Sequence, residues 1–125
     1  MKRVLAYALV VLACPALAAP GLDYASAKAQ ADKDEASLSR EQGSAWLESQ
    51  SELLGDGVAQ CATPNPDFSP LVVVMELDAS GKVIRTWLHG NSPLALCLRK
   101  YAATGSLLAP PRAPFYTSIE LSFTP

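Results

Sequence analysis

The stretch MELDASGKVIRTWLHGNSP, residues 75–93, decides the fold. An apolar run ends at a turn at residues 78–81, where Gly81 supplies the positive φ that such turns require. A second alternating run follows, and the stretch closes on Asn-Ser-Pro. This order is typical of a β-hairpin that leads into a helix.

The two runs predict strands at residues 71–77 and 83–89. The first is rich in β-branched residues and apolar on both faces, so we expect it in the centre of a sheet. In the return strand, Ile84, Thr86 and Leu88 share one face, and Arg85 and Trp87 share the other. The face that the helices cover is left open, so Trp87 is either packed under a helix or exposed.

A helix is predicted to begin after the hairpin. Ser92 or Asn91 can cap it, and Pro93 suits its first turn because the missing N–H has no helical partner there. The helix should end by Gly105. The last segment, 115–123, alternates apolar and polar residues and predicts a half-buried strand.

Upstream, residues 38–61 predict an amphipathic helix, interrupted or weakened at Gly43 and ended or kinked at residues 55–57. Eight acids lie within residues 23–56, which indicates a solvated helix face or an acidic docking surface. Three prolines mark residues 62–70 as a loop. The predicted class is α+β with the order α-β-β-α-β. It has a three-stranded antiparallel sheet in the order 2-1-3, with two helices on one face.

The first 18 residues predict a secretory signal peptide. Lys2 and Arg3 precede an uncharged apolar segment, and Ala-Leu-Ala at 16–18 suits cleavage. The expected location is therefore the periplasm or the exterior, with no membrane span after cleavage. The alternative is a lipoprotein anchored through Cys14, since Val-Leu-Ala-Cys at 11–14 resembles a lipobox.

Cleavage after residue 18 leaves eight Lys and Arg against twelve Asp and Glu, which argues against nucleic-acid binding. Cys61 and Cys97 then remain, and an even pair in an exported chain predicts a disulfide between the two helices. A free buried thiol or a catalytic cysteine is the alternative. Residues 19–37 have few large apolar side chains and are predicted to be a flexible tether before a domain at 38–125.

The sequence offers little catalytic chemistry. His89 is the one histidine, which favours neither a metal site nor a base paired with a nucleophile. No glycine-rich phosphate loop is present. We therefore predict a chain that is not an enzyme and that has no cofactor and no metal.

The segment VVVMELDASGKVIRTWLHGNSPLALCLRKYA, together with LLAPPRAPFYTSIELSF, resembles the C-terminal domain of TonB-like proteins. It is most similar to the cysteine-bearing AgmX/PglI variant. The matching features are the run before Asp78, the glycine turn, Ser92-Pro93, Cys97, Pro110-Pro111 and the final strand, over residues 58–124. A TonB energy transducer keeps its membrane anchor and has a long proline-rich spacer, whereas this sequence is expected to lose its apolar segment and shows no such spacer, so that role is not carried over.

The resemblance implies a domain that binds an envelope protein or an extended peptide by adding a strand to a sheet edge. Strand 83–89 or strand 115–123 would provide the edge, with a homodimer as a further possibility. The candidate partner-binding residues are Trp87, His89, Tyr116, Ser118 and Phe68. The alternative function is that of a small secreted enzyme inhibitor or immunity-type protein, which would insert the loop 62–70 with Phe68 at its tip.

Overall fold

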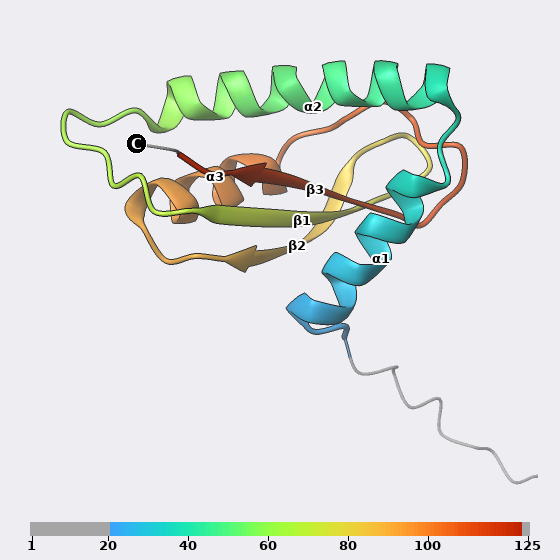
Figure 1. The fold of residues 1–125 in the computed structure, drawn as a ribbon, viewed down its shortest axis with the longest axis horizontal. Coiled ribbons are helices and arrows are strands. Elements are labelled where there is room, and N and C mark those ends of the chain that lie inside the picture. The colour runs from blue at the N-terminus through green and yellow to red at the C-terminus, as the bar shows by residue number, and fades with distance from the viewer. Residues whose placement is uncertain (1–20, 124–125) are drawn as a thin grey trace, which may run out of the picture.

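The computed structural model describes residues 21–123, which form three helices and one three-stranded sheet (Figure 1). The helices are α1 (Tyr24–Ala36), α2 (Arg40–Cys61) and α3 (Pro93–Ala103). The strands are β1 (Leu71–Leu77), β2 (Val83–His89) and β3 (Phe115–Leu121). The predicted signal peptide and Cys14 lie outside the described residues. Within residues 21–123, no helix is both long enough and apolar enough to cross a membrane.

The sheet has the order β2-β1-β3 and both pairings are antiparallel, which confirms the predicted topology. The turn between β1 and β2 is organised by Asp78, whose carboxylate accepts hydrogen bonds from the Ser80 and Lys82 amides. Gly81 has φ +91°, and a Cβ there would lie 2.3 Å from the Leu107 carbonyl oxygen. Only glycine fits both the turn and this close approach.

Helices α2 and α3 cover one face of the sheet, as predicted. The larger core lies between them and the sheet and contains Trp46, Leu53, Leu71, Val73, Met75, Leu77, Leu94, Leu98, Phe115 and Ile119. Helix α3 begins where expected, since the Ser92 hydroxyl caps the Ala95 amide and Pro93 occupies the first turn.

The glycines in α2 do not interrupt it, and the predicted breaks at Gly43 and at residues 55–57 are wrong. Ser39 and Gln42 form a capping box, and the helix then runs unbroken to Cys61. Gly57 is buried against α3. A Cβ at this position would lie only 2.9 Å from Leu98 Cδ2. The small residue lets the two helices approach closely, and the Cys61–Cys97 disulfide joins them.

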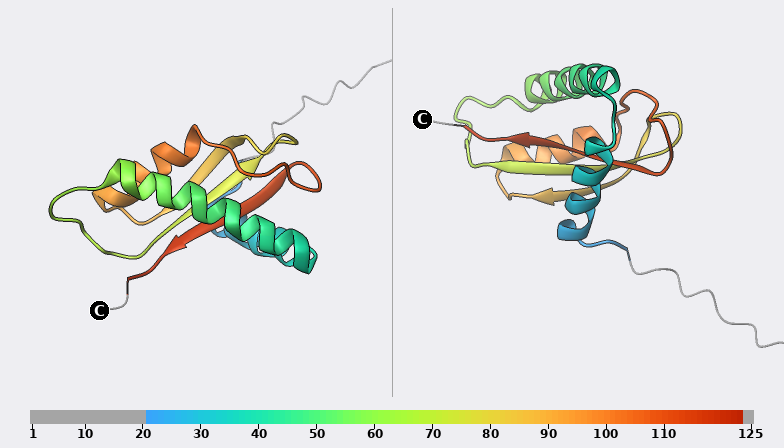
Figure 2. Two further views of the ribbon diagram at one scale, coloured as in Figure 1. Left: turned by 90° about the horizontal axis from the view of Figure 1, so that it is seen from above. Right: turned by 45° about the vertical axis from the view of Figure 1, so that its right-hand side comes forward.

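Residues 24–36 are the main correction to the sequence analysis, because they form α1 and not a flexible tether. This helix lies on the face of the sheet opposite α2 and α3 (Figure 2). Ala27 and Ala31 are fully buried there, beside Val74 and Tyr116. Alanines let the helix lie close to the sheet without large apolar side chains, and for that reason its composition gave no sign of packing.

Replacing both Cys61 and Cys97 with serine should lower the free energy of unfolding by about 4 kcal/mol, because the disulfide closes a long loop in the unfolded chain. Denaturant unfolding with and without a reductant measures this. The reductant should destabilise the parent chain and leave the double variant unchanged. Equal stability of the two oxidised proteins would contradict this role of the disulfide.

Candidate functional site

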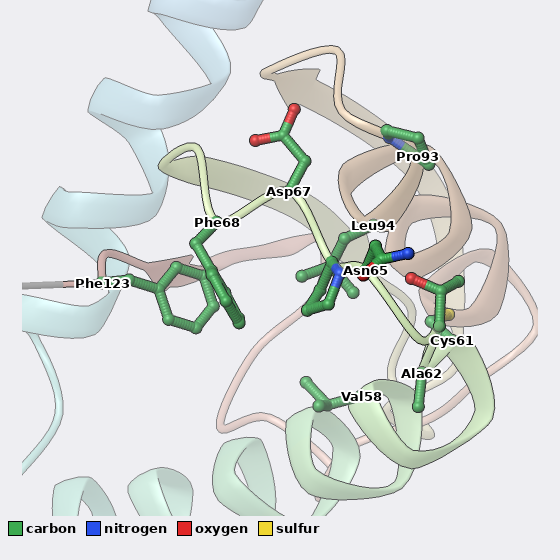
Figure 3. A pocket seen from close by; sticks show the side chains of 11 residues that line it. Val58, Cys61, Ala62, Asn65, Asp67, Phe68, Pro93, Leu94 and Phe123 are labelled. Atoms are coloured by element: carbon green, nitrogen blue, oxygen red, sulfur yellow. The ribbon is translucent and has the colours of Figure 1, made fainter. Parts of the chain in front are cut away.

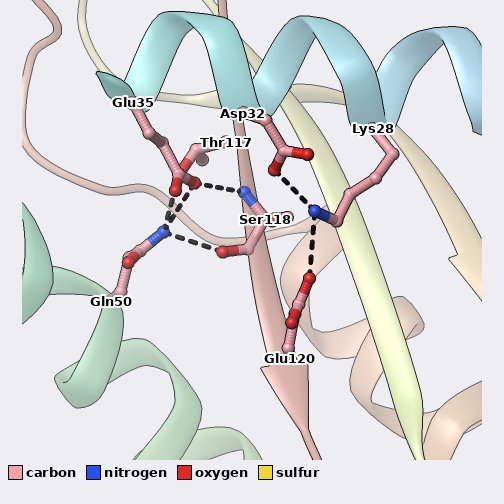
Figure 4. Close-up of polar contacts among 7 residues, drawn as sticks. All are labelled: Lys28, Asp32, Glu35, Gln50, Thr117, Ser118 and Glu120. Atoms are coloured by element: carbon pink, nitrogen blue, oxygen red, sulfur yellow. Dashed lines mark hydrogen bonds and ion pairs between the residues drawn. The ribbon is translucent and has the colours of Figure 1, made fainter. Parts of the chain in front are cut away.

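The two outer strands, β2 and β3, are the candidate docking edges, and hydrogen bonds from helix side chains already hold β3 at Tyr116 and Ser118. The Tyr116 amide donates to Asp34 Oδ2 over 2.9 Å, and the Ser118 amide donates to Glu35 Oε1 over 2.8 Å. The Ser118 carbonyl accepts from Gln50 Nε2 over 2.9 Å (Figure 4). Side chains from α1 and α2 thus bond three outward backbone groups of Tyr116 and Ser118, where a neighbouring strand would otherwise bond them.

The carboxylates that close β3 are themselves held in place. Asp34 is buried and also accepts from Arg112 Nη2, at 3.0 Å, and from Gln30 Nε2, at 2.9 Å. Glu35 Oε1 accepts from the Thr117 hydroxyl over 2.7 Å. A buried carboxylate is stable only with such partners, and each bond to the charged group strengthens the closure.

One further contact ties α1 to the outer strand. Lys28 pairs with Asp32 on its own helix and with Glu120 of β3, at 3.0 Å for the second pair (Figure 4). These hydrogen bonds, that of Asp32 first, raise the pKa of Lys28 to about 12. Lys28 therefore stays charged throughout the physiological range and links α1 to the sheet.

Two candidate residues are engaged by these contacts. The ring of Tyr116 is buried, and its hydroxyl donates to Glu76 Oε1 over 2.5 Å. Burial, and then this hydrogen bond, raises the pKa of the Tyr116 phenol above its ordinary value. The backbone of Ser118 is bonded on both its polar groups. These groups of Tyr116 and Ser118 are therefore already bonded within the domain.

The edge of β2 has the opposite character. The Ser118 amide points away from β1, so Ser118 makes no ladder bond to Val74, the residue opposite it on β1. Val74 therefore directs its N–H and C=O to the other side, toward Trp87 of β2. Trp87 therefore bonds inward, and its neighbours Thr86 and Leu88 direct their N–H and C=O outward. No hydrogen bond from residues 21–123 reaches these outward groups.

The uncovered part of β2 is bounded at one end. The Val83 amide donates to the Gly105 carbonyl, and Lys82 bridges to Ser106, so the loop after α3 closes the start of the strand. A bulge follows, where the register shifts between Glu76 and Leu77. Ile84, at this bulge, is 54% exposed. The free edge therefore runs over residues 84–89.

Trp87 lies on the face of the sheet that α1 covers, and it is partly buried there. The helix beside it is α1, which was not among the predicted helices. Its indole nitrogen donates to the Leu22 carbonyl over 2.7 Å, and its ring lies 5.8 Å from that of Tyr116. The guanidinium of Arg85 stacks on it at 4.8 Å. Trp87 is thus held in one orientation next to the free edge.

Arg85 and His89 complete this face of β2. Arg85 Nη2 pairs with Glu76 Oε1 at 3.0 Å, and that hydrogen bond raises the pKa of Arg85 above its ordinary value. His89 is exposed at the strand end, and its ring stacks on Tyr24 of α1 at 5.4 Å. On its α1 side, β2 therefore carries the aromatic rings of Trp87 and His89 and the cation of Arg85.

Phe68, on the loop 62–70, lines a cavity. Its side chain is 55% exposed, and its ring lies 4.7 Å from that of Phe123. The two rings, with Val58 and Leu94, line an apolar cavity of about 180 Å³ beside Cys61 (Figure 3). The loop 62–70 forms the wall of this cavity.

Among the described residues, the groups that could do chemistry are kept apart. Cys61 and Cys97 form the disulfide, which excludes a free thiol at either position. Residues 21–123 contain no group of three or more His, Cys, Asp and Glu side chains placed to hold a metal ion. The His89 ring stacks on Tyr24, and its side chain makes no hydrogen bond within residues 21–123.

Comparisons with protein-family models, with curated proteins and with solved structures found no match for this chain. The resemblance to TonB-like domains therefore rests on the quoted sequence features alone.

Replacing Asp34 with alanine should expose the β3 edge. The Tyr116 amide and Arg112 lose a buried acceptor, so the free energy of unfolding should fall by about 2–3 kcal/mol. Hydrogen exchange at the Tyr116 and Ser118 amides should speed up. Asp32→Ala is the control, because Asp32 is exposed and pairs only with Lys28, and it should cost less than about 1 kcal/mol. Unchanged exchange in Asp34→Ala would show that α1 does not close this edge.

Proposed function

We propose that this chain is an exported, non-catalytic interaction module that binds an extended segment of an envelope protein along β2. The observation that carries the proposal is the difference between the two edges. The edge of β3 is bonded by Asp34, Glu35 and Gln50, whereas Thr86 and Leu88 of β2 direct their backbone groups outward. An unpaired edge of this kind is the site at which an added strand binds.

The side chains around β2 support the same function. Ile84 on the edge and Leu96 on the adjoining α3 are 54% and 55% exposed. Trp87 is fixed on the other face by its bond to Leu22. Backbone pairing would supply the affinity for a partner strand, and these flanking side chains would contact its alternating residues.

The resemblance to TonB-like domains is consistent with this function. The order β1, β2, α3, β3 and the Cys61–Cys97 disulfide are the features that the resemblance implies. They support a binding domain of this kind. The proposal assigns no catalytic residue, since the described chain brings no nucleophile next to His89.

Export is proposed from residues 1–18 and is tested by the mass of the intact protein recovered from the cell envelope. A chain that begins at Ala19 is expected, because Ala-Leu-Ala precedes that position. A chain that begins at an acylated Cys14 would replace this with a lipid-anchored protein. Retention of Met1 and the apolar segment would contradict cleavage altogether.

The binding edge is tested by photo-crosslinking in the producing cell, with a photoreactive residue at Ile84. A discrete adduct is expected there and not from the same residue placed at Leu47, which is 64% exposed on α2. The change Thr86→Pro removes an outward N–H and should abolish the adduct, because a proline cannot donate to an added strand. Phe68→Ala should leave it intact.

The two substitutions separate the proposed function from the inhibitor alternative. Loss of the adduct in Phe68→Ala and its persistence in Thr86→Pro would favour a partner held by the loop 62–70. The melting temperature of Thr86→Pro must be close to that of the parent protein, so that a lost adduct is not caused by unfolding of the variant. If that variant unfolds, hydrogen exchange at the Thr86 and Leu88 amides of the crosslinked parent protein offers a second test, because an added strand would slow both.

A further inference from the structure

The charges of this chain are strongly divided along its length. No acid occurs between Asp78 and Glu120, while this segment carries five cations: Lys82, Arg85, Arg99, Lys100 and Arg112. Residues 23–56, by contrast, carry eight acids. Strand β2 and helix α3 lie wholly within the segment without acids. The free edge is therefore flanked by cations alone on its own strand and on the helix beside it.

Arg99 brings one of these cations to the edge itself. From α3, its Nε donates to the Thr86 hydroxyl over 3.3 Å, next to the outward backbone groups of that residue. Lys82 is exposed at the start of β2. Neither Arg99 nor Lys82 takes part in an ion pair within residues 21–123. Both side chains therefore have charge to offer to a partner.

Arg85 adds a third cation on the α1 face. One of its nitrogens pairs with Glu76, but its side chain is 44% exposed beside Trp87. Glu76 is 11% exposed and also accepts from Tyr116, so this acid is directed into the sheet and away from the edge. The guanidinium remains accessible from solvent.

The same chain already shows how carboxylates recognise one of its sheet edges. On β3, Asp34 and Glu35 accept from the outward amides of Tyr116 and Ser118. On β2, the equivalent outward amides belong to Thr86 and Leu88, with Arg99 beside them. Acidic groups would meet unpaired donors and unpaired cations on this edge.

We propose that the partner segment is acidic: an extended peptide whose carboxylates reach Arg99 on the α3 face of the sheet while its backbone pairs with Thr86 and Leu88, with Lys82 and Arg85 adding to the positive charge around the edge. This inference rests on the proposed function of β2 and assigns the partner class to it. Opposite charges across paired strands stabilise the pairing, and complementary charge also speeds association.

Two other occupants fit the edge less well. If β2 paired with β2 of a second copy, the cations of both copies would face one another, which destabilises the pairing. A nucleic acid offers no N–H and C=O ladder for Thr86 and Leu88, and residues 19–125 carry a formal charge of −4. An acidic peptide satisfies both the backbone groups and the charges.

The test uses synthetic peptides of about eight residues that alternate valine with a second residue, long enough for a typical strand. Three versions carry glutamate, glutamine or lysine at the second position. Binding to the oxidised protein is followed by NMR titration at low salt. The glutamate peptide should shift the amides of Thr86 and Leu88, bind roughly tenfold more tightly than the glutamine peptide, and weaken as salt is added.

A charge-matched pair of variants completes the test. Arg99→Glu should weaken binding of the glutamate peptide roughly tenfold and leave the glutamine peptide unchanged. Arg40→Glu makes the same charge change at an exposed site at the start of α2 and should alter neither. Arg99→Gln should fall between the parent and Arg99→Glu.

The outcomes distinguish the two levels of the inference. Equal binding of the glutamate and glutamine peptides at β2 would overturn the acidic partner and leave strand addition in place. Tighter binding of the lysine peptide would also overturn it. Self-association of the protein through β2, seen by sedimentation, would replace the acidic segment with a second copy. Peptide shifts confined to the cavity beside Phe68 would count against both the acidic partner and the proposed edge.

Discussion

The arrangement of this domain depends on carboxylates that take the place of a neighbouring strand. A three-stranded sheet has two edges, and each presents backbone donors and acceptors that need partners. Asp34 and Glu35 satisfy the outward amides of β3, and in doing so they fix α1 against the sheet. On β2, no hydrogen bond within residues 21–123 reaches the outward backbone groups of Thr86 and Leu88. The asymmetry between the edges, from which the function is inferred, is therefore produced by three side chains, those of Asp34, Glu35 and Gln50.

The clamp on the other face has a different physical basis. Helices α2 and α3 approach closely at Gly57, and the Cys61–Cys97 disulfide holds them together near that contact. Because the disulfide closes a long loop in the unfolded chain, it adds to the stability that the packed core supplies. The disulfide and the packed core thus hold α2 and α3 on one face of the sheet, while hydrogen bonds and ion pairs hold α1 on the other face.

The sequence predicted those parts of the fold that depend on local patterns. β1 and β2 occupy the predicted residues, and Pro93 begins the last helix, because alternation and capping act over a few neighbouring residues. Strand β3 begins at Phe115 as predicted and ends two residues early, at Leu121. The fold class, the strand order and the disulfide were also predicted correctly, because they follow from the order of these elements and from a pair of cysteines.

Helix α1 and the closed edge could not be predicted in this way. Asp34 and Tyr116 are 82 residues apart in sequence, and an acid that bonds a distant backbone looks like any solvated acid. One signal was available, because β1 is apolar on both faces and Val72 and Val74 need cover on the second. Helix α1 supplies that cover, but its buried residues are alanines, so its sequence did not show a large apolar stripe. Relatives of this domain should therefore be sought by the spacing of Ala27, Ala31, Asp34 and Glu35 on one helix, because ordinary hydrophobic matching would pass over the segment that determines which side of the sheet is open to others.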